Sequence, residues 1–226
     1  SDRSHQPMKR GNAVICYNGE IYNYLELAEN LSNSGINLSS SGDTEILIES
    51  WLRWGPNCLD RFDGMFAFAI LQNQTIHLAV DPFGEKPMYW IKSTEGFFFA
   101  SEPWPLVQLL KIESDLTAET VATFLGMGFL PAPSTGYKGL KKLAPGTRLS
   151  YSPAGNINMV SYWKPSIPES RRGPVTALTE RQLDSINGAL IDSLRVRYRA
   201  DVPIGIFLSS GVDSALIAAL TVKELD

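Results

Sequence analysis

Apolar positions in the first sixty residues predict one short strand followed by two helices. An apolar run over residues 13–17 predicts a buried strand, and Asn18-Gly19-Glu20 predicts a turn after it. Residues 23–34 carry apolar side chains at helical spacing, with a cap pair expected from Asn23 and Glu26 and a stop at Gly35. A second helix is predicted over residues 44–54, beginning at Asp43 or Thr44 and ending before Gly55-Pro56.

The period then changes from helix to strand. Residues 65–71 are apolar at every position, which predicts a strand buried between two layers. A turn at residues 72–74 leads to a returning strand at 75–80, and residues 88–91 and 97–100 read as another hairpin. Two amphipathic helices beside a meander buried on both faces predict an α/β/β/α sandwich or another α+β layer arrangement.

The last sixty residues have a different organisation. Residues 164–174 are polar and rich in proline, which predicts a linker. Thr179 and Gln182 then predict a capping box for a helix whose apolar stripe contains Leu183, Ile186, Leu190 and Leu194. We therefore expect a first domain over residues 1–164, a linker over 165–177 and the start of a second domain over 178–226.

A phosphate-binding loop is predicted at residues 209–214. The apolar run at 202–208 predicts a strand, Ser209-Ser210-Gly211 a turn of small residues, and residues 214–220 a helix. Unpaired N–H groups at a helix start, together with the helix dipole, favour an anion there. A Walker A loop would need a Lys before its final Ser or Thr, which is absent here. The loop resembles instead the Ser-Gly-Gly-x-Asp-Ser loop of ATP pyrophosphatases, with Ser210 in place of the first glycine; the alternative is a strand-to-helix turn whose small residues serve packing.

Composition narrows the classes of function. With 44% hydrophobic and 19% charged residues the chain is an ordinary globular protein, and its net charge of −4 argues against general binding to nucleic acids or anionic membranes. No apolar run approaches the length of a membrane span. Two cysteines do not make a disulfide framework, so a reducing cytoplasm is the expected location.

Both ends of the sequence indicate that the chain is part of a longer protein. The chain opens on Ser1 rather than Met, and one strand and one helix at its other end cannot make a parallel sheet. We expect an internal fragment of a larger protein, or a defective copy of one.

Five segments together resemble one family. They are residues 17–23, 41–45, 62–69, 81–87 and 99–102. From His5 onward the chain resembles the glutaminase domain of class II glutamine amidotransferases, in the order found in the N-terminal half of glutamine-dependent asparagine synthetases. The resemblance implies an N-terminal-nucleophile-type α/β/β/α sandwich, followed by the first helix, strand, loop and helix of a parallel α/β nucleotide-binding domain.

The resemblance also implies a glutamine site. Asn18 would offer its side-chain amide and Gly19 its backbone N–H to the tetrahedral oxyanion, which needs preorganised donors. Glu20 and Asp43 would hold the α-ammonium group of glutamine. Each residue has a structural alternative, because Asn18-Gly19 is a strong turn signal and Asp43 could cap a helix.

The family's nucleophile is not expected within this chain. These amidotransferases use an N-terminal Cys whose own α-amine acts as the base, whereas here Ser1 is followed by Asp2. Ser1 lies too close to the next matched motif to take that role. Cys16 lacks a terminal amine and is expected to be a small buried core residue.

In the second domain the resemblance implies an ATP site that contains six residues. Leu208 would flank the adenosine, Ser209, Ser210, Gly211 and Ser214 would cradle the pyrophosphate, and Asp213 would hold the phosphates through Mg²⁺. The alternative for Asp213 is a carboxylate favoured by the helix dipole.

The resemblance implies that the full-length protein makes asparagine from glutamine, ATP and aspartate, and that it can form a homodimer. The 226-residue chain alone is expected to be inactive. Two alternatives stay open: a sister ligase that amidates another carboxylate, such as a sugar acid in surface-polysaccharide assembly, and a non-catalytic remnant. The residues of the acceptor pocket would distinguish asparagine synthetase from the sister ligase. A Met-Cys-Gly start in the parent reading frame would exclude the non-catalytic remnant.

Overall fold

The chain divides into two units, residues 1–165 and residues 166–226. The computed structural model describes residues 5–166, 177–199 and 203–224. Residues 167–176, which make up most of the predicted linker, lie outside the described residues.

The first unit is built on two antiparallel sheets. The larger has the strand order β1 (Met8–Arg10), β2 (Ala13–Ile21), β3 (Gly64–Gln72), β4 (Thr75–Val80), β8 (Thr147–Tyr151) and β9 (Ile157–Ser161). The smaller has the order β6 (Phe97–Ala100), β5 (Tyr89–Lys92) and β7 (Lys141–Lys142). The helices of this unit are α1 (Tyr24–Asn33), α2 (Asp43–Trp54), the 3₁₀ helix η2 (Gly55–Arg61), α3 (Pro103–Leu110) and α4 (Ala118–Met127).

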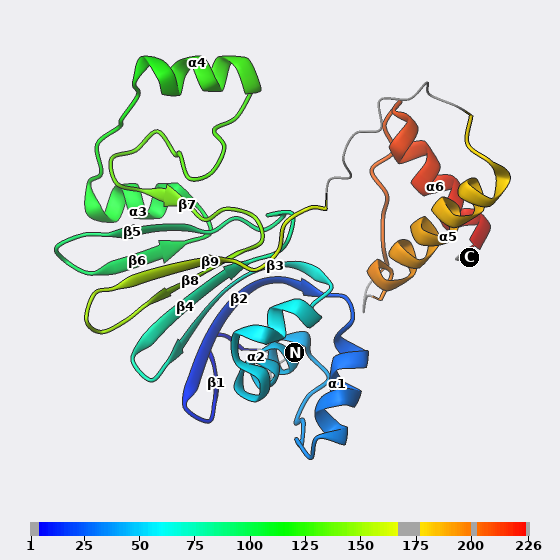
Figure 1. Ribbon diagram of the computed structural model, residues 1–226, viewed down its shortest axis with the longest axis horizontal. Helices are drawn as coiled ribbons and strands as arrows, with labels where there is room; N and C mark the ends of the chain where they lie inside the picture. The colour runs from blue at the N-terminus through cyan, green and yellow to red at the C-terminus, as the bar shows by residue number, and fades with distance from the viewer. Residues whose placement is uncertain (1–4, 167–176, 200–202, 225–226) are drawn as a thin grey trace. The chain divides into compact units, whose positions relative to one another are not determined.

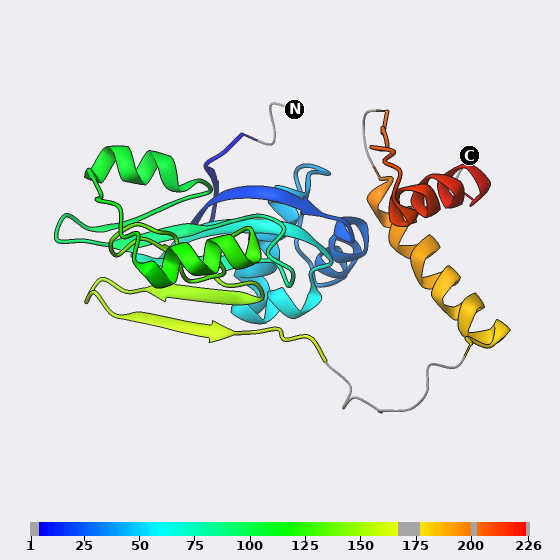
Figure 2. The ribbon, with the colours of Figure 1, turned by 90° about the horizontal axis from the view of Figure 1, so that it is seen from above.

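Three apolar clusters stack these elements in four layers. Phe66, Phe68 and Ile70 of β3 pack with α1 and α2. Ala67 and Ala69, on the other face of the same strand, pack with β5 of the smaller sheet. The far face of that sheet packs on α3. Helices, sheet, sheet and helix therefore follow one another, which confirms the predicted α/β/β/α sandwich and the strand buried on both faces (Figures 1 and 2).

The turn predicted at residues 18–20 is wrong. Strand β2 continues to Ile21, and Asn18, Gly19 and Glu20 pair in register with Ala67, Phe66 and Met65 of β3. Asn-Gly favours a turn when the local chain decides the conformation. Here a nine-residue ladder with β3 decides it instead, and the dipeptide lies within the sheet.

The cap pair predicted at the start of α1 is also wrong. Asn23 occupies the N-cap position, but its side chain makes no cap hydrogen bond. It donates instead to the carbonyl oxygen of Arg61 at 2.9 Å and accepts from the N–H of Asp63 at 3.0 Å. This side chain therefore fastens the start of α1 to the segment that enters β3. The predicted starts and stops at Asp43, Gly35 and Gly55 agree with the observed ends of α1 and α2.

A buried carboxylate organises the loop after β4. Asp81 is fully buried, and its side chain accepts hydrogen bonds of 2.9–3.1 Å from the backbone N–H groups of Phe66, Phe83, Glu85 and Lys86. Four such bonds hold the loop rigidly against the start of β3. The same loop carries Lys86, whose positive charge acts on Glu20.

The second unit contains α5 (Glu180–Arg197) and α6 (Val212–Glu224). The predicted capping box is confirmed, because the Thr179 side chain accepts from the N–H of Gln182 and the Gln182 side chain accepts from the N–H of Thr179. The two helices contact each other, and the hydroxyls of Tyr198 and Thr221 lie 2.9 Å apart. Leu183 and Ile186 of the predicted stripe remain about half exposed.

The strand predicted just before the phosphate loop is not formed. Residues 203–209 have no strand hydrogen bonding, and Phe207 is fully exposed. A strand exists through its ladder partners, and the described part of the second unit offers none.

No helix in the described ranges combines the length and apolarity needed to cross a membrane.

Candidate functional site

The candidate site lies at the C-terminal end of β2. Along this strand Ile15 and Tyr17 belong to the helix-side core, while Cys16 and Asn18, on the alternate positions, border a cavity. The side-chain amide of Asn18 forms no hydrogen bond within the described part of the chain. Its donors are therefore available to a ligand.

The cavity beside Asn18 has a volume of about 170 Å³. Small side chains from β3 and from the end of β6 leave this space open. Its lining consists of Gln6, Cys16, Tyr17, Asn18, Ala67, Ala69, Met88, Phe99, Ala100 and Ser101. The Asn18 side chain thus borders open space on one face of the larger sheet.

Asp43 is fastened to the same strand from the helix layer. The Tyr17 hydroxyl donates to its Oδ2 at 2.8 Å, and the backbone N–H of Ile21 donates to the same oxygen at 3.2 Å. The other oxygen, Oδ1, accepts no hydrogen bond from the residues that the structure describes. One oxygen thus holds Asp43 in place and the second can receive a cationic group.

The pKa of Glu20 is affected by the charge of Asp43. Burial raises the pKa of Glu20, the negative charge of Asp43 raises it further, and the positive charge of Lys86 opposes both. Burial also raises the pKa of Tyr17, as do the charge of Asp43 and its hydrogen bond, so the phenol keeps the proton that it donates. Two neighbouring carboxylates create a potential that favours an ammonium group.

The structure therefore brings Asn18, Gly19, Glu20 and Asp43 to one end of β2. Sequence reasoning gave no role to Tyr17, Lys86 or Gln6, although each stands in or near a motif. The Tyr17–Asp43 contact spans 26 residues of sequence, and nothing in the local pattern announces it.

Cys16 departs from its expected environment. The sequence predicts a buried core residue here, but Cys16 is exposed and lines the cavity. Its pairing partner in β3 is Ala69, whose methyl side chain leaves the thiol exposed. Cys16 and Cys58 are both free thiols, in agreement with the absence of a disulfide framework.

In the second unit the serine-rich loop folds onto itself. The hydroxyls of Ser209 and Ser214 lie 2.8 Å apart, and the Ser209 hydroxyl also accepts from the N–H of Gly211 at 3.2 Å. Ser210 has no positive φ, so a serine costs no backbone strain where related loops carry glycine. The loop leads directly into α6, whose first turn contains Asp213.

The donor set of this loop fits Mg²⁺ only together with a phosphate ligand. No group of three or more His, Cys, Asp or Glu side chains suited to a metal ion is found among the described residues. Asp213 is exposed in the first turn of α6, beside the hydroxyl-rich loop. Mg²⁺ prefers such oxygen donors and is commonly held by one or two carboxylates plus substrate phosphates and water.

Family models match both units. One described as a glutamine amidotransferase domain matches residues 1–163, and one described as asparagine synthase matches residues 185–226. Among solved structures, glutamine phosphoribosylpyrophosphate amidotransferase from Bacillus subtilis aligns with 70% of this chain and 32% of its own, at 22% identity and a TM-score of 0.49.

Curated relatives match most of this sequence and are longer than it. Asparagine synthetase [glutamine-hydrolyzing] 1 of Bacillus subtilis (strain 168) is 34% identical over 91% of this chain and 32% of the relative. A putative asparagine synthetase [glutamine-hydrolyzing] of Mycobacterium bovis is 34% identical over 98% of this chain and 36% of the relative. This chain thus spans about a third of their length. With both units matched in order, the chain belongs to the family of glutamine-dependent asparagine synthetases.

Proposed function

We propose that the first unit binds glutamine at the end of β2 for hydrolysis to glutamate and ammonia. The observation that carries the proposal is Asp43, which is held by Tyr17 and Ile21 beside Glu20 and has one carboxylate oxygen free of hydrogen bonds from the described residues. Asp43 and Glu20 would bind the α-ammonium group. Asn18 and Gly19 would stabilise the oxyanion that forms when the amide carbonyl is attacked.

No residue of this chain is proposed as the nucleophile. Cys16 borders the cavity, but it lies in the middle of β2 and has no free α-amine to act as its base. The roles proposed for this chain are therefore substrate binding and oxyanion stabilisation. Catalytic measurements are accordingly proposed for the gene product that contains this chain.

For the second unit we propose binding of ATP by the loop from Leu208 to Ser214. ATP would transfer its AMP group to the carboxylate of aspartate and release pyrophosphate; ammonia would then displace AMP and give asparagine. Ser209, Ser210, Gly211 and Ser214 would contact the pyrophosphate, and Asp213 would share Mg²⁺ with it. When bound, Mg²⁺ would neutralise phosphate charge. The acceptor is assigned from the names of the relatives, and a reducing cytoplasm is the proposed location.

Replacing Asp43 by asparagine tests the glutamine site. The variant keeps the shape of the side chain but removes the charge that faces the ammonium group. A charge-assisted hydrogen bond contributes about 1.5–3 kcal/mol, so the KM for glutamine should rise roughly 10- to 100-fold. Steady-state glutamate release at varied glutamine concentration measures the effect.

Asp63→Asn provides the matched control, because it makes the same chemical change at an exposed carboxylate just before β3. Its KM should stay within about twofold of the wild-type value. Equal KM values for the Asp43 variant and the wild type would remove Asp43 from the ligand site.

A further inference from the structure

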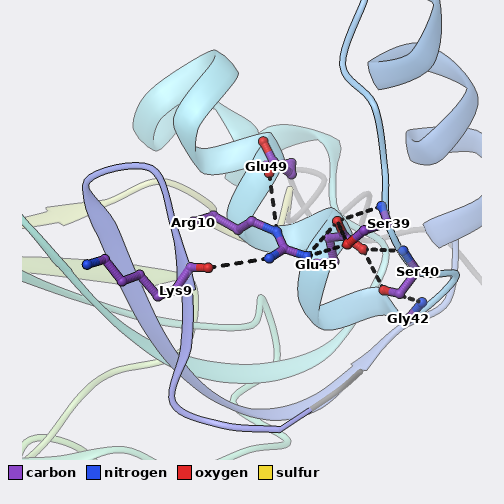
Figure 3. Close-up of polar contacts among 7 residues, drawn as sticks. All are labelled: Lys9, Arg10, Ser39, Ser40, Gly42, Glu45 and Glu49. Carbon is purple, nitrogen blue, oxygen red and sulfur yellow. Dashed lines mark hydrogen bonds and ion pairs between the residues drawn. The ribbon is translucent and has the colours of Figure 1, made fainter. Parts of the chain in front are cut away.

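A buried carboxylate lies two residues after Asp43, in the first turn of α2. Glu45 is 1% exposed, although charged side chains are rarely buried without partners. Its Oε1 accepts from the N–H and the hydroxyl of Ser39, each at 2.8 Å, and its Oε2 accepts from the N–H of Ser40 at 2.6 Å and from the Ser40 hydroxyl (Figure 3). The side chain thus gathers the loop in front of the helix.

This loop has no ordinary helix cap to fix it. The N-cap residue of α2 is Gly42, which makes no side-chain cap hydrogen bond. Instead, the Ser40 hydroxyl held by Glu45 accepts from the N–H of Gly42 at 3.4 Å. A continuous chain of contacts therefore runs from Glu45 through Ser40 to the residue immediately before Asp43.

The cation that balances Glu45 comes from β1. Arg10 donates from Nη2 to Oε1 of Glu45 at 2.8 Å, and its Nε lies 3.7 Å from Glu49. Burial works to raise the pKa of Glu45, but the hydrogen bonds from Ser40, Ser39 and Arg10 outweigh it and lower the pKa to about 2. The carboxylate consequently stays charged at neutral pH and keeps all five donors.

We propose that Glu45 is a positioning residue for the glutamine site: by fixing residues 39–42 against Arg10, it sets the place of Asp43 on β2. The inference rests on the proposed function. Asp43 is held to β2 by Tyr17 and Ile21, while Glu45 is held to β1 by Arg10. Two adjacent strands therefore grip one helical turn through two acidic side chains. Loosening the Glu45 contact releases the loop on which the position of Asp43 depends.

The test compares Glu45→Gln with Glu49→Gln in the gene product that contains this chain. The neutral amide of Glu45→Gln turns a donor toward N–H and hydroxyl donors, so the loop loses its anchor. The KM for glutamine should rise at least about tenfold, as expected for losing one or two charge-assisted hydrogen bonds, while kcat changes less than threefold. Hydrogen exchange at the amides of Ser39, Ser40 and Gly42 should accelerate by a similar factor.

Glu49→Gln is the matched control, because Glu49 also faces Arg10 but no hydrogen bond joins it to the loop. It should leave KM and exchange within twofold. Ser40→Ala, which keeps the charge and removes only the hydroxyl bridge, should raise KM three- to tenfold and provides a second test if Glu45→Gln fails to fold. An unchanged KM in the Glu45 or Ser40 variant, or an equal rise in Glu49→Gln, overturns the proposal. If the wild type hydrolyses no glutamine, the proposed function fails instead, and accelerated exchange would still report the loop anchor.

Discussion

Gly19→Ala should destabilise the first unit by at least about 3 kcal/mol, equivalent to more than a hundredfold in the folding equilibrium. A Cβ at this position would lie 2.1 Å from the carbonyl oxygen of Met65 and 2.7 Å from Cα of Phe66. Both are backbone atoms of the central strand β3, so a side-chain movement cannot relieve the clash. Gly19 also has a φ of +148°, which L-residues rarely adopt. Urea unfolding, followed by tryptophan fluorescence, measures the loss.

The same substitution at Gly126 is the control. Gly126 lies within α4, and a Cβ there would meet no atom within 4 Å. Replacing it by alanine should be neutral or stabilise by up to about 1 kcal/mol through helix propensity. A Gly19→Ala variant as stable as the wild type would contradict the close approach of β2 and β3 at Gly19.

Asn18→Ala should reduce kcat for glutamine hydrolysis by about 10²–10³-fold. An oxyanion-hole donor acts mainly on the transition state, and removing one typically has this effect. The KM for glutamine should change little, because the proposed ammonium ligands Glu20 and Asp43 remain. Amide synthesis from free ammonia should also be unaffected, since that route bypasses hydrolysis. Rates of glutamate release, measured beside ammonia-dependent AMP formation, separate the two steps.

Asn158→Ala serves as the control for this variant. Asn158 is an exposed residue of β9, at the edge of the same sheet. Its replacement should leave both rates within about twofold. A similar loss in both variants would assign the effect to the sheet, and full activity of Asn18→Ala would exclude Asn18 from the oxyanion hole.

The layers could be predicted because the apolar pattern changes period where the structure changes element. Helical spacing before residue 55 and continuous apolarity over 65–71 describe α2 and β3 well, since each signal arises from burial on one or both faces. The turn predicted at Asn18-Gly19 is wrong because the preference of a dipeptide reflects only its local conformation. The pairing with β3, some fifty residues away in sequence, determines its conformation.

The site was only partly accessible from sequence for the same reason. Motif resemblance named Asn18, Gly19, Glu20 and Asp43, but not what holds them. Tyr17 reaches Asp43 across the α2–sheet interface, and Arg10 reaches Glu45 from β1. Such contacts join residues 26 and 35 positions apart and require the packed fold. The strand predicted before Ser209 is not formed, because a strand needs hydrogen-bonding partners from other segments of the chain.

Transfer of label from amide-¹⁵N glutamine tests most directly the claim that a glutamine site serves an ATP-dependent amide synthesis. The gene product that contains this chain would be incubated with labelled glutamine, unlabelled aspartate, ATP and Mg²⁺, and its products analysed by mass spectrometry. We predict ¹⁵N in the amide of asparagine, with AMP and glutamate formed alongside, and loss of that label in Asn18→Ala. Unlabelled asparagine, or no ATP-dependent amide product of aspartate, would contradict the proposed glutamine-dependent amide synthesis.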